Sequence, residues 1–297
     1  MTVQFLSSPT QGTSPLALPR PSLSHWFQDV DAFGQAFYAQ GLALAQLDAG
    51  RFEGSVIKLQ IEDLQLLRLT ANASLYTLGP KPPDTFTFSL SLAEPQGLFI
   101  SHKQALSPQA LFGFDPSREI SLITPEQMQI AIVLVPRYRL DRYLHDIDRD
   151  DLNAKFFQQN AVQLDNQRLG DLRAYLNQIF YLADTNPDVL TRWSMTSPQG
   201  LSPALILGDL LPLLVNSLST DVSPRCCTQA FSRAAMVQAA EAFMQDNLDR
   251  PLTLEAICQS IKTSKSALSY GFHDIFGLSP MAYLKTVRLH GVRRALR

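Results

Sequence analysis

Residues Phe276–Arg297 read FGLSPMAYLKTVRLHGVRRALR, and the interpretation of the fold starts from this stretch. Ser279 has a side chain that caps helix N-termini, and Pro280 suits the first helical position because its φ angle is fixed. Apolar residues then alternate with lysine and arginine over a length of about 26 Å, at about 1.5 Å per helical residue. The stretch therefore predicts a long helix that carries positive charge.

Two shorter predicted helices precede this one. Thr253 is placed to cap the first of them, and Ser264 is placed to cap the second, which we expect to end at Gly277. An earlier helix is predicted from Arg233, and Asn247 near its end can take the left-handed conformation of a C-terminal cap. Two short helices joined by a tight turn, the second of them well capped, are typical of a helix-turn-helix unit.

The second helix of this pair has two different sides when positions are separated by about 100° per residue. One side is expected to pack against the protein and consists of Ser264, Leu268, Gly271, Phe272 and Ile275. The other side is polar and consists of Ser266, Ser269, Tyr270 and His273. A helix fits the major groove of DNA, where such polar groups hydrogen-bond to base edges. The alternative is a solvated polar face on an ordinary helical hairpin.

Cationic side chains near this helix are suited to DNA phosphates. Lys262 and Lys265 flank the turn, and Lys285 and Arg288 lie on the charged helix. We therefore expect DNA contacts at Lys262, Thr263, Lys265, Ser266, Ser269, Tyr270, His273, Lys285 and Arg288. The polar side of the second helix would contact bases, and the four cations would contact the backbone.

In these residues the chain resembles the AraC/XylS family of bacterial transcription regulators. The family pattern is matched in order and spacing by Phe272, Phe276, Gly277, Leu278, Ser279, Pro280, Tyr283, Leu284, Arg288, Leu289, Arg293 and Leu296. The resemblance covers about 234–297, roughly a fifth of the chain. It implies an all-α DNA-binding domain in which the charged helix links two helix-turn-helix units.

The second of those units does not occur in this sequence. We therefore expect the chain to be a fragment, and a protein that naturally ends early is the alternative. A single unit neutralises fewer phosphates than two, so we expect this chain to bind operator DNA weakly.

Net charge differs between the two parts of the chain. From Gln229 onward, nine basic and five acidic residues give a net charge of +4, whereas the remaining 16 basic and 22 acidic residues give −6. A basic part on an acidic body indicates that a polyanionic partner binds the C-terminal part alone.

Asp221–Gln229, DVSPRCCTQ, is polar and contains proline. We therefore place a linker at 221–230 and the DNA-binding domain at 231–297.

Between about 54 and 136 the sequence has short runs of strand type, separated by turn-forming Gly, Pro and Asp. The runs are GSVIKLQI, LQLLRLT, TFTFSLSL, GLFIS, EISLIT and MQIAIVLVP. Repeated short strands at this spacing predict a small antiparallel barrel or sandwich. After Pro136 apolar residues recur three and four apart, which predicts amphipathic helices over about 137–220.

Family members usually carry a sensory or dimerising domain ahead of the DNA-binding unit, often a small β barrel followed by pairing helices. Residues 1–220 resemble that arrangement by pattern. The resemblance thus implies an α+β protein, with an N-terminal antiparallel β barrel (cupin-like) with helices and then an all-α helix-turn-helix domain.

The interior of such a barrel could hold a small effector. Its candidate lining residues are the aromatic residues Phe86, Phe88, Phe99, Phe112 and Phe114. The alternative is that these residues form ordinary hydrophobic core. Arg68 and Lys103 are candidates to meet an anionic ligand, or else they are solvated surface cations.

The predicted helix Pro203–Leu218 is the candidate for dimerisation, because its apolar surface is too broad for one packing stripe. The residues expected to pair are Leu207, Leu211, Leu214 and Leu218. Core packing within one monomer is the alternative.

No residue pattern in the chain indicates a catalyst, a metal site or a cofactor. The five histidines are scattered, and the sequence has no nucleophile elbow, phosphate loop or dinucleotide turn. Three cysteines without metal-ligand spacing suit a reducing compartment, so we expect a cytoplasmic protein. The apolar stretch Leu201–Leu218 is interrupted by Asp209 and Pro212, so we expect no membrane span.

The sequence therefore predicts a transcription regulator, not an enzyme, that binds double-stranded DNA. From the family we expect a homodimer that is more often an activator than a repressor, with RNA polymerase as a partner if it activates and with a small-molecule effector. The alternative is a truncated interaction protein that dimerises with a full-length regulator without strong DNA binding of its own.

Overall fold

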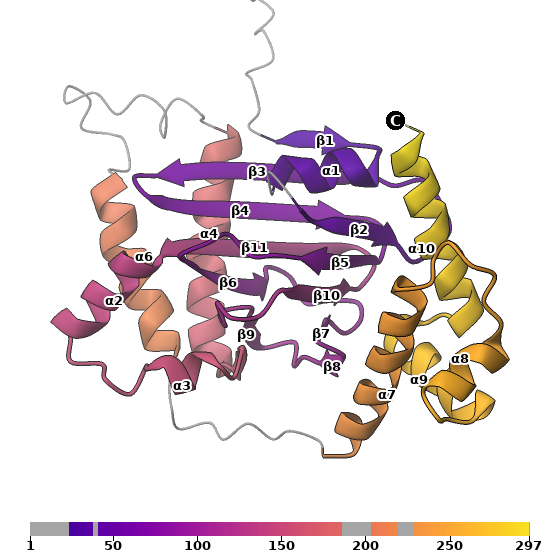
Figure 1. Cartoon of the computed structure of the whole chain (residues 1–297). Coiled ribbons are helices and arrows are strands. Elements are labelled where there is room, and N and C mark those ends of the chain that lie inside the picture. The colour runs from indigo at the N-terminus through magenta and orange to yellow at the C-terminus, as the bar shows by residue number, and fades with distance from the viewer. Residues whose placement is uncertain (1–23, 38–40, 186–202, 219–227, 297) are drawn as a thin grey trace, which may run out of the picture.

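The computed structural model describes residues 24–37, 41–185, 203–218 and 228–296. These residues form an α+β protein whose strands lie in two antiparallel sheets, with helices packed on both sides (Figure 1). The predicted α+β class and the antiparallel pairing are confirmed. The hydrogen bonds between strands run in two separate sheets, and closure into one cupin-like barrel is not shown.

The two sheets differ in size. The seven-stranded sheet consists, in spatial order, of β1 (His25–Phe27), β3 (Gly54–Ile61), β4 (Leu64–Ala71), β11 (Met128–Pro136), β6 (Thr85–Ser91), β9 (Ala110–Phe112) and β12 (Ala161–Gln163). The five-stranded sheet consists of β2 (Ala43–Gln46), β5 (Leu75–Gly79), β10 (Ile120–Thr124), β7 (Ile100–Ser101) and β8 (Gln104–Ala105). Strands β3, β4, β6, β10 and β11 lie within one residue of their predicted bounds. Of the predicted run GLFIS only Ile100–Ser101 is a strand, and β5, β8 and β9 lie between the predicted runs.

Central strands of both sheets contribute to two cores, because successive side chains of a strand point to opposite faces. In β11, Ile130 and Ile132 lie in the core between the sheets, whereas Ala131 lies in the core on the other face. In β5, Leu75 lies between the sheets and Tyr76 faces away from them. The five-stranded sheet is thus the layer that separates the inter-sheet core from the C-terminal helices.

Helices after β11 cover the outer face of the seven-stranded sheet. They are α2 (Arg137–Asp146), α3 (Ala154–Phe157), α4 (Asn166–Thr185) and α6 (Pro203–Ser217), while α1 (Val30–Phe37) packs on β2 and β3. The helix predicted at Pro203–Leu218 is present with nearly the same bounds. Within the described ranges no helix is both long and apolar enough to cross a membrane.

The C-terminal helices gather beside the five-stranded sheet (Figure 1). They are α7 (Thr228–Gln245), α8 (Leu254–Ser260), α9 (Lys265–Phe276) and α10 (Pro280–Ala295). Most of the linker predicted at 221–230 lies outside the described residues, and α7 already begins at Thr228. The domain boundary itself stays a prediction.

Asn247 does not take the predicted left-handed conformation, since it is absent from the described residues with positive φ. Its side chain instead donates a hydrogen bond of 2.8 Å to the Phe243 carbonyl oxygen in the last turn of α7. This bond satisfies a helix-end carbonyl in another way, and the chain needs no left-handed residue there.

One buried carboxylate joins the C-terminal helices to the five-stranded sheet. Glu241 of α7 is 7% exposed, and its Oε1 accepts hydrogen bonds of 2.6 Å from the hydroxyls of Tyr76 in β5 and Tyr283 in α10. The ammonium of Lys103, in the β7–β8 turn, lies 2.7 Å from Oε2. The carboxylate therefore gathers donors from a strand, a turn and another helix. We call these four residues the Glu241 cluster.

Burial is the largest influence on the other ionisable members of this cluster. Desolvation and the neighbouring Glu241 carboxylate raise the pKa of Tyr76 and of Tyr283, so both phenols stay protonated and donate. Desolvation lowers the pKa of Lys103 by more than Glu241 raises it. Because a buried ion costs free energy unless it is paired, Lys103 depends on Glu241.

Replacing Glu241 by Gln should destabilise the protein strongly, because the change leaves the Lys103 ammonium buried without its counter-charge. We expect the free energy of unfolding to fall by about 3–5 kcal/mol in urea titrations. Adding Lys103→Met to the same chain should recover part of this loss. Equal stability of Glu241→Gln and the parent protein would contradict the proposed role of the cluster.

Candidate nucleic-acid interface and internal cavity

The turn between α8 and α9 is built by side-chain caps at the predicted positions. Thr253 Oγ1 accepts a hydrogen bond of 3.2 Å from the Ala256 amide at the start of α8, and Ser264 Oγ accepts one of 3.1 Å from the Ala267 amide at the start of α9. Gly277 ends α9 in the left-handed region at φ 66°. These local bonds fix where α9 begins and ends.

The packed side of α9 holds the helix against its neighbours. Leu268 and Phe272 are fully buried, and Ile275 is nearly so. The rings of Phe276 and Tyr283 lie 4.5 Å apart, and the Phe276 ring also lies 5.5 Å from that of Tyr76 in β5. The helix is therefore clamped by α10 and by the five-stranded sheet.

The opposite side of α9 faces outward, as predicted. Ser266 and His273 are exposed, Tyr270 is 61% exposed, and Ser269 is half-buried. Neither the sheet nor another described helix buries the outward side, so a groove of DNA could approach it. Whether these residues contact bases stays a prediction.

The predicted phosphate contacts lie in different surroundings. Lys262 and Lys285 are exposed, and Lys262 occupies the left-handed region at φ 53° in the α8–α9 turn. Lys265 is exposed and forms an ion pair with the exposed Glu255, whose pKa this pair lowers. An exposed pair of this kind is weak, so Lys265 can exchange Glu255 for a phosphate at little cost.

Arg288 and Thr263, two further predicted contacts, are engaged by partners within the protein. The Arg288 guanidinium donates through Nε, over 3.0 Å, to the Leu248 carbonyl oxygen and also donates to the Arg250 carbonyl oxygen. It thereby holds the loop after α7 against α10. The Thr263 hydroxyl is half-buried and lies 3.1 Å from the Met236 sulfur. Both side chains are therefore less available to DNA than the sequence indicates.

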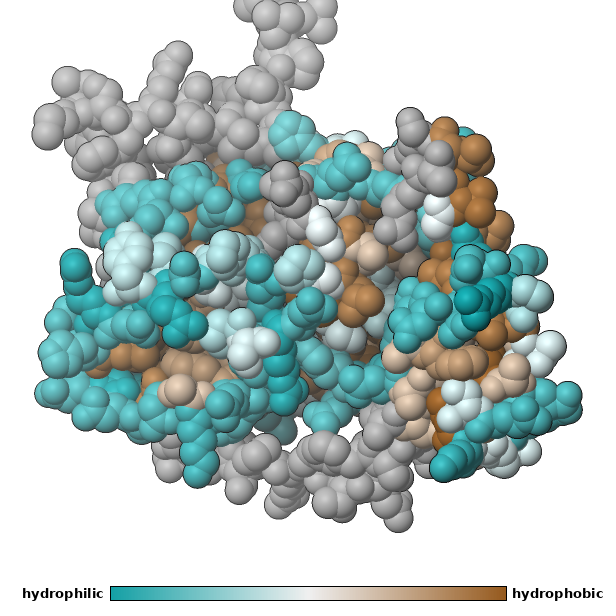
Figure 2. Space-filling model, in the orientation of Figure 1, coloured by the Kyte–Doolittle hydropathy of each residue, from teal (hydrophilic) through white to brown (hydrophobic). Residues whose placement is uncertain are grey.

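The outer face of α10 is apolar in part. Leu289, Val292 and Leu296 are each more than half exposed and recur at helical spacing, and apolar residues gather over α10 on the surface (Figure 2). The same stretch of the helix also lies against β2, where the Gln46 backbone amide donates over 3.3 Å to His290 Nε2. The described surface of α10 is thus less suited to DNA than that of α9.

The residues predicted to pair in a dimer lie mostly inside the monomer. Leu214 and Leu218 are fully buried and Leu211 is 6% exposed, all within the core that α6 shares with α4. The side chain of Leu207 lies outside the described residues. These three leucines thus pack within the monomer core, which is the alternative to pairing. Pairing through α6 stays a prediction.

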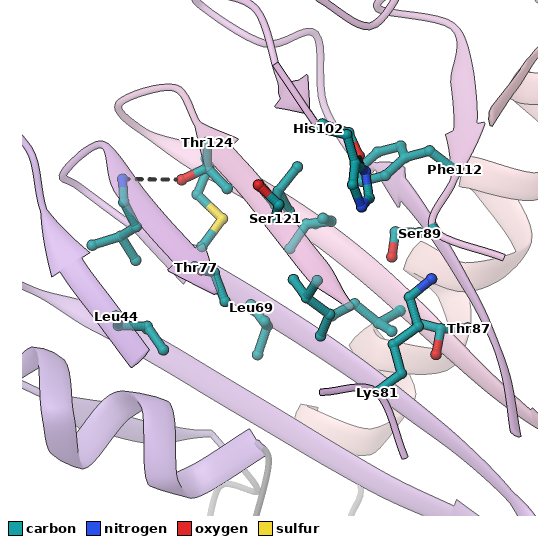
Figure 3. A pocket seen from close by; sticks show the side chains of 18 of the residues that line it. Leu44, Leu69, Thr77, Lys81, Thr87, Ser89, His102, Phe112, Ser121 and Thr124 are labelled. Carbon is teal, nitrogen blue, oxygen red and sulfur yellow. Dashed lines mark hydrogen bonds between the residues drawn. The ribbon is translucent and has the colours of Figure 1, made fainter. Parts of the chain in front are cut away.

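A cavity lies between the two sheets, with a volume of about 60 Å³. One end is apolar, with Leu44 and Leu69, and the other end gathers the side chains of Lys81, Thr87 and His102 (Figure 3). Of the predicted aromatic lining residues, Phe112 lines the cavity. Phe99 lies in the inter-sheet core, whereas the others belong to the core on the far face of the seven-stranded sheet: Phe86, Phe88 and Phe114.

Lys81 supplies the positive charge at the polar end. Its ammonium donates to the Asp115 carbonyl oxygen over 2.5 Å and to Asn160 Oδ1 over 3.4 Å, and both acceptors are uncharged. The Asp115 carboxylate is instead engaged by Arg118 at 3.2 Å and by Ser117. Burial therefore outweighs the attraction of Asp115 and lowers the pKa of Lys81 to about 8.

The other polar groups at this end are neutral. His102 Nε2 lies 3.0 Å from the Glu119 carbonyl oxygen, which can only accept, so this nitrogen carries the proton. Burial, as the largest cause, lowers the pKa of His102. The Thr87 hydroxyl is buried and has no hydrogen-bond partner among the described residues. The cavity thus combines one cation with an unpaired hydroxyl.

Arg68 and Lys103, the cations expected to meet a ligand, do not line the cavity. Arg68 Cζ lies 6.0 Å from the centre of the Phe180 ring of α4, on the other side of the sheet. Lys103 is neither solvated nor in the cavity but belongs to the Glu241 cluster.

Lys81 was not predicted as a cavity residue, because the stretch GPKPP indicates only a turn. No local pattern indicates that this turn folds over the inter-sheet core.

No protein-family model matches the chain. Among solved structures, a crystal structure of the AraC-like transcriptional activator CuxR is similar, with 15% sequence identity and a TM-score of 0.44 over 91% of this chain and 94% of that one. A similarity this distant carries no conclusion about function, which has to be inferred from the residues of this chain.

Thr87→Val should stabilise the protein, because it replaces an unpaired buried hydroxyl with a methyl group of the same shape. We expect the free energy of unfolding to rise by about 1 kcal/mol. Thr70→Val is the matched control, since Thr70 Oγ1 is paired with Ser55 Oγ at 2.7 Å, and its loss should destabilise by about 1 kcal/mol. Urea titrations measure both; a destabilising Thr87→Val would mean that its hydroxyl is satisfied.

Proposed function

We propose that this chain is a sequence-specific DNA-binding transcription regulator of AraC type. The proposal rests on the geometry of α9, a capped helix. Leu268 and Phe272 are buried on one side of it, and Ser266, Tyr270 and His273 are exposed on the outward side. In this arrangement α8 and α9 form the helix-turn-helix unit. The outward side of α9 enters the major groove, and its polar groups hydrogen-bond to base edges.

Charge supports the same assignment. Lys262 lies in the turn immediately before α9, and Lys265 lies in its first turn. Cations at these positions lie beside the groove-facing helix, where they can neutralise phosphates. The C-terminal part is also basic although the chain as a whole is slightly acidic. Phosphate contacts would set the affinity, and α9 would set the sequence preference.

We further propose that the protein is a cytoplasmic homodimer that activates transcription with RNA polymerase as its partner, and that it responds to a small effector. The resemblance of 234–297 to AraC/XylS proteins supports the first three parts. The cavity between the sheets supports the effector. It lies on the inner face of β5 and β10, and the C-terminal helices pack on the outer face of the same sheet.

The direct test is selection from a random duplex DNA library, followed by mobility-shift titrations of the enriched sequence. We expect one enriched motif whose affinity falls with salt concentration. No enrichment over a scrambled duplex would remove the DNA-binding proposal. The rival, an interaction protein that pairs with a full-length regulator, predicts that outcome.

Substitutions at Tyr270 and Lys262 should have different effects on this binding. Tyr270→Ala should change which sequence is enriched, because the side chain lies on the outward side of α9. Lys262→Ala should weaken binding to all duplexes alike and reduce the slope of log affinity against log salt by about one. Lys155→Ala, at an exposed position of α3, is the control. Identical motifs and salt slopes in the two variants would contradict this division of roles.

Glu255→Gln should tighten DNA binding. Glu255 holds Lys265 in an exposed ion pair, and its loss frees one cation and removes one negative charge beside α9. We expect the affinity for the enriched duplex to rise by about two- to tenfold at constant salt. Glu126→Gln removes the same charge at an exposed site in the turn between β10 and β11 and serves as the control. Equal changes in the two variants would show that only net charge matters.

A further inference from the structure

We propose that the cavity between the sheets binds a small organic monoanion with an apolar body, of the short-chain carboxylate class, with its charge on Lys81 and one oxygen on the Thr87 hydroxyl. The inference deepens the effector part of the proposed function. It does not depend on DNA binding, because it concerns contacts inside the sheet region alone.

The charge of the site selects an anion. Lys81 is the only charged residue among the described residues that line the cavity. Nearby, Arg118 and the Asp115 carboxylate offset each other as an ion pair, and His102 is neutral. The polar end therefore carries about one uncompensated positive charge, which favours a monoanion and disfavours an amine.

The hydrogen-bond donors select an oxyanion. Thr87 is 5% exposed, and its hydroxyl has no partner among the described residues although it lines the cavity beside Lys81 (Figure 3). A hydroxyl can donate to an oxyanion, and a carboxylate offers several acceptor positions to the hydroxyl and the ammonium together. One group on the ligand would thus satisfy both side chains.

The apolar end and the volume limit the rest of the ligand. Leu44 and Leu69 line this end (Figure 3), and no charged side chain lies among the lining residues there. The cavity volume is about 60 Å³. Since a cavity needs only about 10–15 Å³ open to a water-sized probe to hold one water molecule, the space suits a chain of a few carbon atoms rather than a sugar or a nucleotide.

The test is titration of the full chain with butyrate, butan-1-ol and butylamine, followed by protein NMR shifts of the inter-sheet methyl groups. These probes share a carbon chain and differ in head group. We expect saturable binding of butyrate, binding of butan-1-ol weaker by about tenfold, and no binding of butylamine. Absence of saturable butyrate binding, or equal binding of the three probes, would overturn the proposal.

Binding should also depend on pH, with a sign set by Lys81. The ammonium is charged below its pKa of about 8 and attracts the carboxylate there, whereas deprotonation removes the attraction. The affinity for butyrate should therefore be highest near about pH 6.5 and fall by about tenfold toward about pH 9.5. An affinity that is flat or that rises across this range would overturn the role of Lys81.

Two variants separate binding from folding. Lys81→Met removes the charge and should weaken butyrate binding by about tenfold, with Lys58→Met at an exposed position of β3 as the control. If Lys81→Met fails to fold, Thr87→Val is decisive, because it should stabilise the free protein and yet weaken butyrate binding by about threefold or more. Unchanged affinity in Thr87→Val overturns the proposal. DNA binding is measured separately, so loss of either property can be distinguished from loss of the other.

Discussion

The carboxylate of Glu241 is the interaction on which the arrangement of the molecule depends. It collects two phenol hydroxyls and an ammonium from β5, α10 and the β7–β8 turn, and it is almost fully buried. An apolar contact between helices and a sheet tolerates small shifts, whereas a buried carboxylate with three donors has few satisfactory geometries. The Glu241 cluster therefore fixes how the C-terminal helices sit on the five-stranded sheet.

The position of α9 follows from this constraint. Tyr283, held by Glu241, packs against Phe272 and Phe276, so the buried side of α9 is fixed and its polar side must face outward. The five-stranded sheet provides the base for this packing with one face, and with its other face it closes the inter-sheet cavity. The five-stranded sheet thus lines the cavity with one face and supports the C-terminal helices, α9 among them, with the other.

Local features of this fold could be predicted from the sequence, and long-range ones could not. The caps at Thr253, Ser264 and Ser279 depend on residues a few positions apart, and the structure has them as predicted. The two sides of α9 are also present, except that Ser264, which was expected on the packed side, is exposed. The short strands β5, β9 and β12 were missed, because they are defined by partners far along the chain. The same holds for the Glu241 cluster, where Tyr76 and Glu241 are 165 positions apart, and for Lys81 over the cavity.

His102 and Lys103 are adjacent in the β7–β8 turn, and both have positive φ, at 49° and 64°. This conformation costs a residue other than glycine about 1 kcal/mol or more, and glycine or asparagine would be the easier choice in so short a hairpin. Here the two side chains point to separate destinations, His102 into the cavity and Lys103 to Glu241. Two adjacent residues of one turn therefore place their side chains on opposite faces of the sheet. A substitution that relaxed the backbone of this turn would therefore remove a side-chain anchor on one face of the sheet or the other.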